Sequence, residues 1–241
     1  MAHIKKEDPI TISEGISADV YTLRNNKGTA IKVLTYGARL ISWRFLGKGY
    51  KFVDVLANSD VSDQSRGAVI NSEKDLTKEI WEAEETYEGL KLVQLGSTVI
   101  YSLSNDNELS IKYESHTAAL HNRLVFNTEI LKDPKIKVFS DEFKGEHQAL
   151  TSDYDFKWEI RDREAEVEME IGQFGYDPTC PIDYLDAGLK NAAEVFSSES
   201  GILLQLYETE LPLHFSAVKS GLLIETGGMT QGQVVYVLKS R

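Results

Sequence analysis

The octapeptide EAEVEMEI, residues 164–171, alternates apolar and acidic side chains without a break. Its apolar members are Ala165, Val167, Met169 and Ile171, and a glutamate precedes each of them. A period of two over eight residues places the apolar side chains on one face of an extended strand and the carboxylates on the other. This stretch therefore predicts a β-strand with one face buried.

Nine further stretches have the composition of short strands. They cover residues 19–23, 30–34, 40–45, 52–56, 98–103, 109–113, 136–139, 202–207 and 234–238. Turn-forming clusters at 25–28, 47–49 and 104–107 separate several of them, and the two Asn-rich clusters are expected to be hairpin loops. The spacing predicts an all-β protein.

Helical spacing is restricted to two segments. Residues 75–85 carry Leu76, Ile80 and Trp81 at intervals compatible with a helix, and residues 184–196 are a second candidate. Neither is long enough to anchor a helical layer, so we expect β-sheets packed face to face as a large twisted antiparallel β-sandwich. Without an internal repeat or a linker, residues 1–241 are expected to form one domain, with residues 1–17 as an N-terminal lead-in.

Composition excludes several classes of protein. The chain has 241 residues, 41% hydrophobic and 27% charged, which is typical of a soluble globular protein. A net charge of -12 argues against nucleic-acid partners, since phosphate binding requires clustered Lys and Arg. No apolar stretch is long enough to cross a bilayer, so no membrane partner is expected.

The expected compartment is the cytoplasm. The first residues, MAHIKKEDP, lack the apolar centre of a signal peptide. Cys180 is the only cysteine, which excludes an internal disulfide and fits a reducing compartment. The sequence contains no phosphate-binding glycine loop, no metal-spaced His and Cys cluster and no nucleophile elbow.

Glu225 is the most suggestive ionisable residue. It follows the apolar run Leu222-Leu223-Ile224 and precedes Thr226-Gly227-Gly228. The pattern predicts a strand that carries one acid to its tip and then turns on two glycines, which would present the acid at an opening. A surface glutamate at a strand end is the alternative interpretation.

Residues 33–43, VLTYGARLISW, followed by FVDVL at 52–56, resemble the opening of the aldose 1-epimerase (galactose mutarotase) family. Further segments are similar to motifs of that family, in the family's order: Leu23-Arg24-Asn25, residues 97–114, Asp155-Phe156-Lys157, Gly175-Tyr176-Asp177, Ser200-Gly201, Leu213-His214-Phe215, Ile224-Glu225-Thr226 and Gly232. The resemblance covers almost the whole chain, from about residue 18 to about residue 238.

The resemblance implies a β-supersandwich, a small-molecule carbohydrate as partner, and a reaction that requires neither a metal nor an organic cofactor. In that family the glutamate matched by Glu225 is the general base. It removes the proton of the anomeric hydroxyl while a histidine protonates the ring oxygen, so that the sugar opens and closes again on either face. Such chemistry requires a base and an acid with pKa values near the working pH.

Several family motifs are degenerate in this chain. The position of the acid histidine falls at Arg123 or Phe126, and neither side chain can donate a proton at accessible pH. The motif that supplies a sugar-binding arginine is reduced to residues 67–72, GAVINS, and the segment with a second histidine is missing between Glu73 and Leu95. Pro178 and Gly227 replace a histidine and a glutamine.

His121 is the candidate replacement for the acid. It lies two residues before Arg123, so both side chains would share a face if this stretch is a strand, and the near-neutral pKa of imidazole suits the role. The resemblance marks His214, Asp177 and Arg123 as candidate sugar-binding residues. Candidates for an aromatic platform beneath a sugar are Trp81, Trp158, Tyr176 and Phe126.

Three functions remain open from the sequence. The first is a sugar-binding protein on the aldose 1-epimerase scaffold, whose mutarotase activity is in doubt because the acid histidines are missing. The second is an active aldose 1-epimerase that interconverts the α and β anomers of a hexose, with Glu225 as base. The third is a non-catalytic structural relative with a closed pocket, because fold alone does not determine function.

Overall fold

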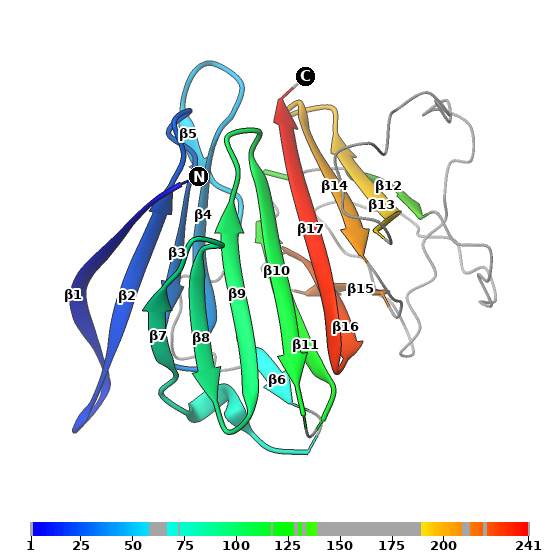
Figure 1. Ribbon diagram of the computed structural model, residues 1–241. Coiled ribbons are helices and arrows are strands. Elements are labelled where there is room, and N and C mark those ends of the chain that lie inside the picture. The colour runs from blue at the N-terminus through cyan, green and yellow to red at the C-terminus, as the bar shows by residue number, and fades with distance from the viewer. Residues whose placement is uncertain are drawn as a thin grey trace.

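The computed structural model describes residues 2–57, 67–71, 73–116, 118–127, 130–131, 134–138, 189–208, 213–218 and 221–240. These residues form strands in three antiparallel sheets and one short 3-10 turn (Figure 1). The predicted all-β sandwich is confirmed. All nine shorter stretches predicted as strands lie in or overlap a strand, whereas residues 164–171 lie outside the described residues.

The five-stranded sheet is a meander in chain order. It consists of β1 (His3–Ser13), β2 (Ile16–Arg24), β3 (Ala30–Leu34), β4 (Arg39–Leu46) and β5 (Phe52–Asp54). The expected lead-in thus contains β1, an edge strand that pairs with β2 along its length. The Asn-rich cluster at 25–28 forms the turn between β2 and β3, where Gly28 has a φ of 84° that favours glycine.

The eight-stranded sheet contains the C-terminal strand at its centre. Its order is β12 (Pro134–Val138), β13 (Lys190–Ser197), β14 (Ile202–Glu208), β17 (Gln231–Ser240), β10 (Glu108–Ser115), β9 (Ser97–Leu103), β8 (Leu90–Gln94) and β7 (Glu82–Glu85). β9 shows why these segments are strands, because every second residue is buried from Ser97 to Leu103.

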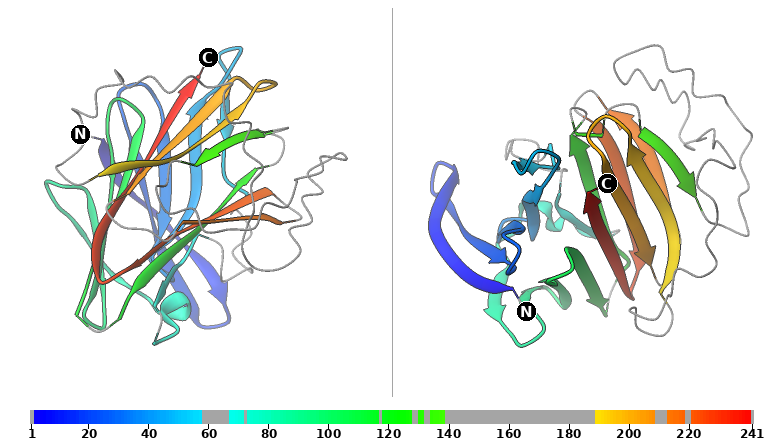
Figure 2. Two further views of the ribbon diagram at one scale, coloured as in Figure 1. Left: turned by 90° about the vertical axis from the view of Figure 1, so that its right-hand side faces the viewer. Right: turned by 90° about the horizontal axis from the view of Figure 1, so that it is seen from above.

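The four-stranded sheet has the order β15 (Leu213–Val218), β16 (Gly221–Met229), β11 (Leu120–Asn127) and β6 (Val69–Asn71). In Figure 1 it lies behind β10, β17 and β14, and Figure 2 shows the layers from two further directions. One ring from each sheet meets in the shared core: Trp43 of β4, Phe126 of β11 and Tyr236 of β17, with centroids 6.3 to 6.4 Å apart.

Both helix predictions are wrong for the described residues. Residues 75–85 contain only the 3-10 turn η1 (Leu76–Lys78), and extended backbone at Glu79 then leads into β7. Leu76 and Trp81 are buried as a helix would require, but an extended segment brings both into the core. Residues 190–196 belong to β13, where pairing with β12 and β14 overrides the helical preference of its alanines.

Candidate functional site

Glu225 lies in the middle of β16, which corrects the expectation of a strand tip. The strand continues through Gly227 and Gly228 to Met229, because β11 pairs with it that far. A register shift between Leu120 and His121 leaves Gly228 of β16 without a partner residue on β11. The chain turns only between Met229 and Gln231. The carboxylate therefore stands on the face of a sheet.

Alternation along β11 divides its side chains between the core and the open face of the four-stranded sheet. Asn122, Leu124 and Phe126 are buried on the inner side, whereas His121 and Arg123 are partly exposed. The expectation that His121 and Arg123 share a face if the stretch is a strand is met. Along β16, Ile224 and Thr226 are likewise buried and Glu225 is partly exposed.

Arg123 stands directly opposite Glu225 in the register of β11 and β16. Its Nε lies 3.2 Å from Oε2 of Glu225, and Nδ1 of His121 lies 3.8 Å from Oε1 of the same carboxylate. The three side chains are 26% to 34% exposed, so a ligand on this face can reach all of them. Arg123 Nε itself is buried and forms no hydrogen bond within the described part of the chain, so its contact with Glu225 is an ion pair.

The two positions at which the resemblance places the family's acid histidine, Arg123 and Phe126, differ in their surroundings. Phe126 is fully buried against Trp43 and Tyr236 and is part of the core. Arg123 is the residue opposite the glutamate. A guanidinium remains protonated at every accessible pH, so the side chain at this position cannot act as a general acid.

The other residues singled out from the sequence fall into three groups. His214 lies on β15 and its backbone is opposite Glu225, so positions 214, 225 and 123 form one row across three strands. Asp177, Trp158 and Tyr176 lie outside the described residues. Trp81 and Phe126 are buried in the core and cannot serve as a platform for a ligand.

A buried polar layer lies on the inner side of the site, which the sequence reasoning did not find. Asn122, between His121 and Arg123, is opposite Thr226, the neighbour of Glu225, and both are buried. The hydroxyls of Thr226 and Tyr236 are 3.0 Å apart. The available signal was a polar residue at the buried position of each strand, where an apolar side chain is the rule.

Tyr101 belongs to the same layer. Its hydroxyl donates to the carbonyl of Ala38 at 2.7 Å. Burial raises the pKa of Tyr101 far above its ordinary value, while the Asn122 side chain acts in the opposite direction. The phenol therefore stays neutral, and it connects the inner side of the site to the five-stranded sheet.

The described part of the open face thus combines the Glu225 carboxylate, as an acceptor, with guanidinium and imidazole donors. Because the arginine already neutralises the glutamate, the pair suits an uncharged ligand with several hydroxyl groups better than a free ion. Among the described residues, no group of three His, Cys, Asp or Glu side chains is placed to hold a metal ion. No helix in the described part of the chain is long and apolar enough to span a membrane.

Comparison with solved structures identifies the fold. The GalM/aldose epimerase homologue from C. elegans superposes with a TM-score of 0.63 at 14% sequence identity, over 92% of this chain and 99% of that one. Galactose 1-epimerase from Lactobacillus acidophilus superposes with a TM-score of 0.59 at 13% identity, over 100% and 99%. No protein-family model and no curated protein sequence matches significantly. The chain has the β-sandwich fold of the aldose 1-epimerases.

Proposed function

We propose that this protein binds an uncharged monosaccharide on the open face of the four-stranded sheet and has little or no mutarotase activity. The observation that carries the proposal is the 3.2 Å contact between Arg123 Nε and Glu225 Oε2, which pairs the candidate base with a side chain that cannot act as an acid. A carboxylate and a guanidinium side by side can accept from and donate to neighbouring hydroxyl groups of one sugar ring.

The low mutarotase activity that we propose follows from the missing general acid. Loss of a general acid removes about 10²- to 10⁴-fold in rate, which leaves little advantage over spontaneous mutarotation. His121 is the remaining candidate acid, but its Nδ1 lies 3.8 Å from the carboxylate that would act as base. Acid and base so close together contact each other, whereas the reaction needs them on either side of the bond between the anomeric carbon and the ring oxygen.

The binding proposal is tested by titrating the ¹⁵N-labelled protein with glucose and galactose, followed by NMR. We expect saturable shifts at His121, Arg123 and Glu225, and an affinity at least tenfold lower for Glu225→Gln, since a hydrogen bond to a charged group contributes about 1.5–3 kcal/mol. Glu82→Gln, which alters an exposed carboxylate on β7, is the matched control and should bind normally. Absence of shifts with every monosaccharide would contradict the proposal and favour the structural relative with a closed pocket.

The catalytic alternative is tested by polarimetry of fresh α-glucose and α-galactose. We expect at most weak acceleration by the native protein. Arg123→His places a titratable donor opposite Glu225, and we expect it to increase the rate about 100-fold, the lower end of the range of general-acid contributions. A high rate in the native protein that is lost in both Glu225→Gln and His121→Gln would instead establish an active aldose 1-epimerase with His121 as acid.

A further inference from the structure

The turn between β4 and β5 exposes an aromatic ring that the fold does not use. Tyr50 is 91% exposed, the largest exposed fraction among the exposed large hydrophobic residues of the described chain. Its backbone has a φ of 59°, in the left-handed region that residues other than Gly, Asn and Asp rarely adopt. The turn is closed by a 3.0 Å hydrogen bond from Gly47 N to Lys51 O. The backbone conformation of Tyr50 is therefore unfavourable, and its exposed side chain gains no packing contacts in return.

The same turn is basic within an acidic protein. The sequence ARLISWRFLGKGYKFV, residues 38–53, contains no Asp or Glu, whereas the chain as a whole carries a net charge of -12. Arg44, Lys48 and Lys51 are exposed, and no ion pair involves any of the three within the described ranges. Arg44 instead lies over the ring of Phe52, 5.9 Å from its centroid. We call Arg44, Lys48, Tyr50, Lys51 and Phe52 the basic tip.

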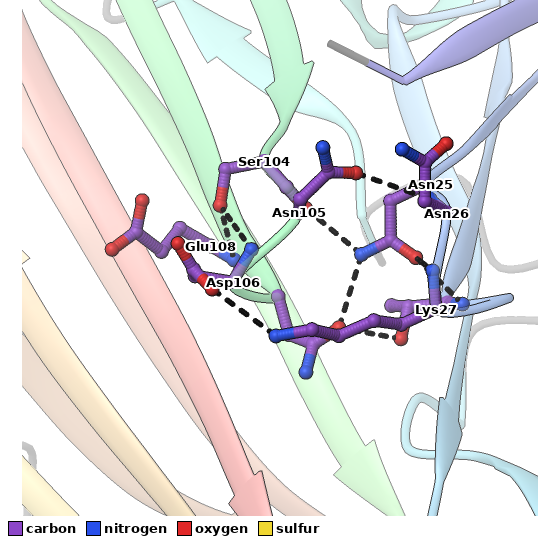
Figure 3. Close-up of polar contacts among 9 residues, drawn as sticks. Asn25, Asn26, Lys27, Ser104, Asn105, Asp106 and Glu108 are labelled. Carbon is purple, nitrogen blue, oxygen red and sulfur yellow. Dashed lines mark hydrogen bonds and ion pairs between the residues drawn. The ribbon is translucent and has the colours of Figure 1, made fainter.

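The basic tip rests on a rigid base. The ring of Phe52 covers Gly28, where an added Cβ would lie only 2.7 Å from Cζ of that ring. The turn that contains Gly28 is itself held against the loop between β9 and β10 (Figure 3). Asn25 Nδ2 donates to the carbonyl of Ser104 at 2.8 Å and to Asn107 Oδ1 at 3.0 Å. The backbone that carries Tyr50 therefore loses little further conformational entropy on binding.

We infer that the basic tip is a docking surface for a short acidic segment of a partner polypeptide, with Tyr50 as its anchor. Tyrosine and arginine dominate the binding energy of many protein interfaces, and Lys48 and Lys51 flank the ring to pair with carboxylates. This surface is separate from the Glu225 site, so the inference does not rest on the proposed sugar binding.

The net negative charge of the protein favours a short acidic peptide over larger anions such as nucleic acid or an anionic membrane. An extended polyanion such as nucleic acid, or an anionic membrane, interacts with a large area and is repelled by the net charge of -12. A short peptide at the tip interacts mainly with charges within about one Debye length, roughly 8 Å at physiological salt. The exposed charges of the tip itself are positive, and the carboxylate of Asp54, opposite Arg44 in the register, is occupied by hydrogen bonds from Ser42 Oγ and from the backbone N–H groups of Trp43 and Leu56.

The test uses the full-length ¹⁵N-labelled protein and a fluorescein-labelled octaglutamate peptide at physiological salt. We expect peptide-induced NMR shifts confined to residues 44–52 and saturable fluorescence anisotropy. Lys48→Glu combined with Lys51→Glu should weaken binding at least tenfold, and Tyr50→Gly should weaken it several-fold without unfolding the turn. The matched control combines Lys5→Glu with Lys74→Glu, two exposed lysines outside the tip, and should leave the affinity unchanged.

Two results would overturn the inference. One is peptide binding that is absent, or that the control pair weakens as much as the tip pair does. The other is tip-dependent binding of phosphatidylserine vesicles or of a single-stranded oligothymidine at least as tight as that of the peptide, which would assign the tip to a membrane or a nucleic acid. Monosaccharide titration of the Lys48→Glu, Lys51→Glu variant should match the native protein, which keeps the two sites experimentally separate.

Discussion

Some single residues in this protein adopt conformations that their side chains disfavour. Tyr50 and Asn107 both have a positive φ, but Asn tolerates it and Asn107 also accepts hydrogen bonds from Asn25 and Thr29. Tyr50 has no comparable compensation within its turn. On the outer face of the four-stranded sheet, the charge of Arg123 is likewise paired with the carboxylate of Glu225.

Replacing Tyr50 by Gly is expected to stabilise the protein by about 0.5–1 kcal/mol. The left-handed backbone costs a tyrosine about 1–2 kcal/mol, part of which is offset by the greater freedom of glycine in the unfolded chain. Urea denaturation measures the change. Tyr87→Gly is the control, because Tyr87 is also exposed but has no positive φ. Equal effects of the two substitutions would show that strain at Tyr50 is not the cause.

At the scale of secondary-structure elements, two distant hairpins are joined through one side chain. Asn25 is buried at the end of β2, and its Oδ1 accepts from the backbone N–H groups of Lys27 and Thr29 at 3.0 Å each. Its Nδ2 reaches the loop between β9 and β10, as Figure 3 shows. This amide thus shapes its own turn and connects the five-stranded sheet to the eight-stranded one.

Asn25→Ala is expected to lower the free energy of unfolding by about 2–3 kcal/mol, since it leaves buried donors and acceptors unpaired. Chemical denaturation followed by fluorescence provides the measurement. Asn26→Ala is the matched control, because the exposed Asn26 contributes only its backbone N–H to this junction. A loss below about 0.5 kcal/mol for Asn25→Ala would contradict the proposed role of the junction.

The whole molecule is held by a core in which all three sheets meet. Trp43, Phe126 and Tyr236 come from different sheets and contact one another through tilted or edge-on rings. Tyr236 also reaches the hydroxyl of Thr226 beside Glu225. The core and the open face are therefore two sides of the same four-stranded sheet, and the position of the candidate site depends on how the sheets pack.

Phe126→Ala is expected to destabilise the protein by about 3–5 kcal/mol, because it leaves a cavity where the three sheets join. Thermal and urea unfolding measure the loss. Phe52→Ala removes the same ring from a position that is 40% exposed and should cost much less. Similar losses for the two substitutions would mean that the contact of the three rings does not dominate the core.

Much of the fold was predictable because strand patterns are local. Period-two alternation and turn clusters identified nine strands, and the acidic stretch at 164–171 is a tenth candidate outside the described residues. The same local rule correctly placed His121 and Arg123 on one face. Local reasoning failed at residues 75–85 and 190–196, where strand pairing and burial of Leu76 and Trp81 outweighed helical spacing.

The sequence by itself determined the all-β class, the likeness to the aldose 1-epimerases and the choice of Glu225 as the residue to follow. Only the tertiary structure decided that Glu225 lies within a strand, that Arg123 rather than Phe126 is opposite it, and that Asn122 and Thr226 are buried on the inner side of the same two strands. The physical reason is that strand register joins residues far apart in the chain. It is set by the bulge at Gly228 of β16 and by the packing of three sheets, and no local pattern encodes either.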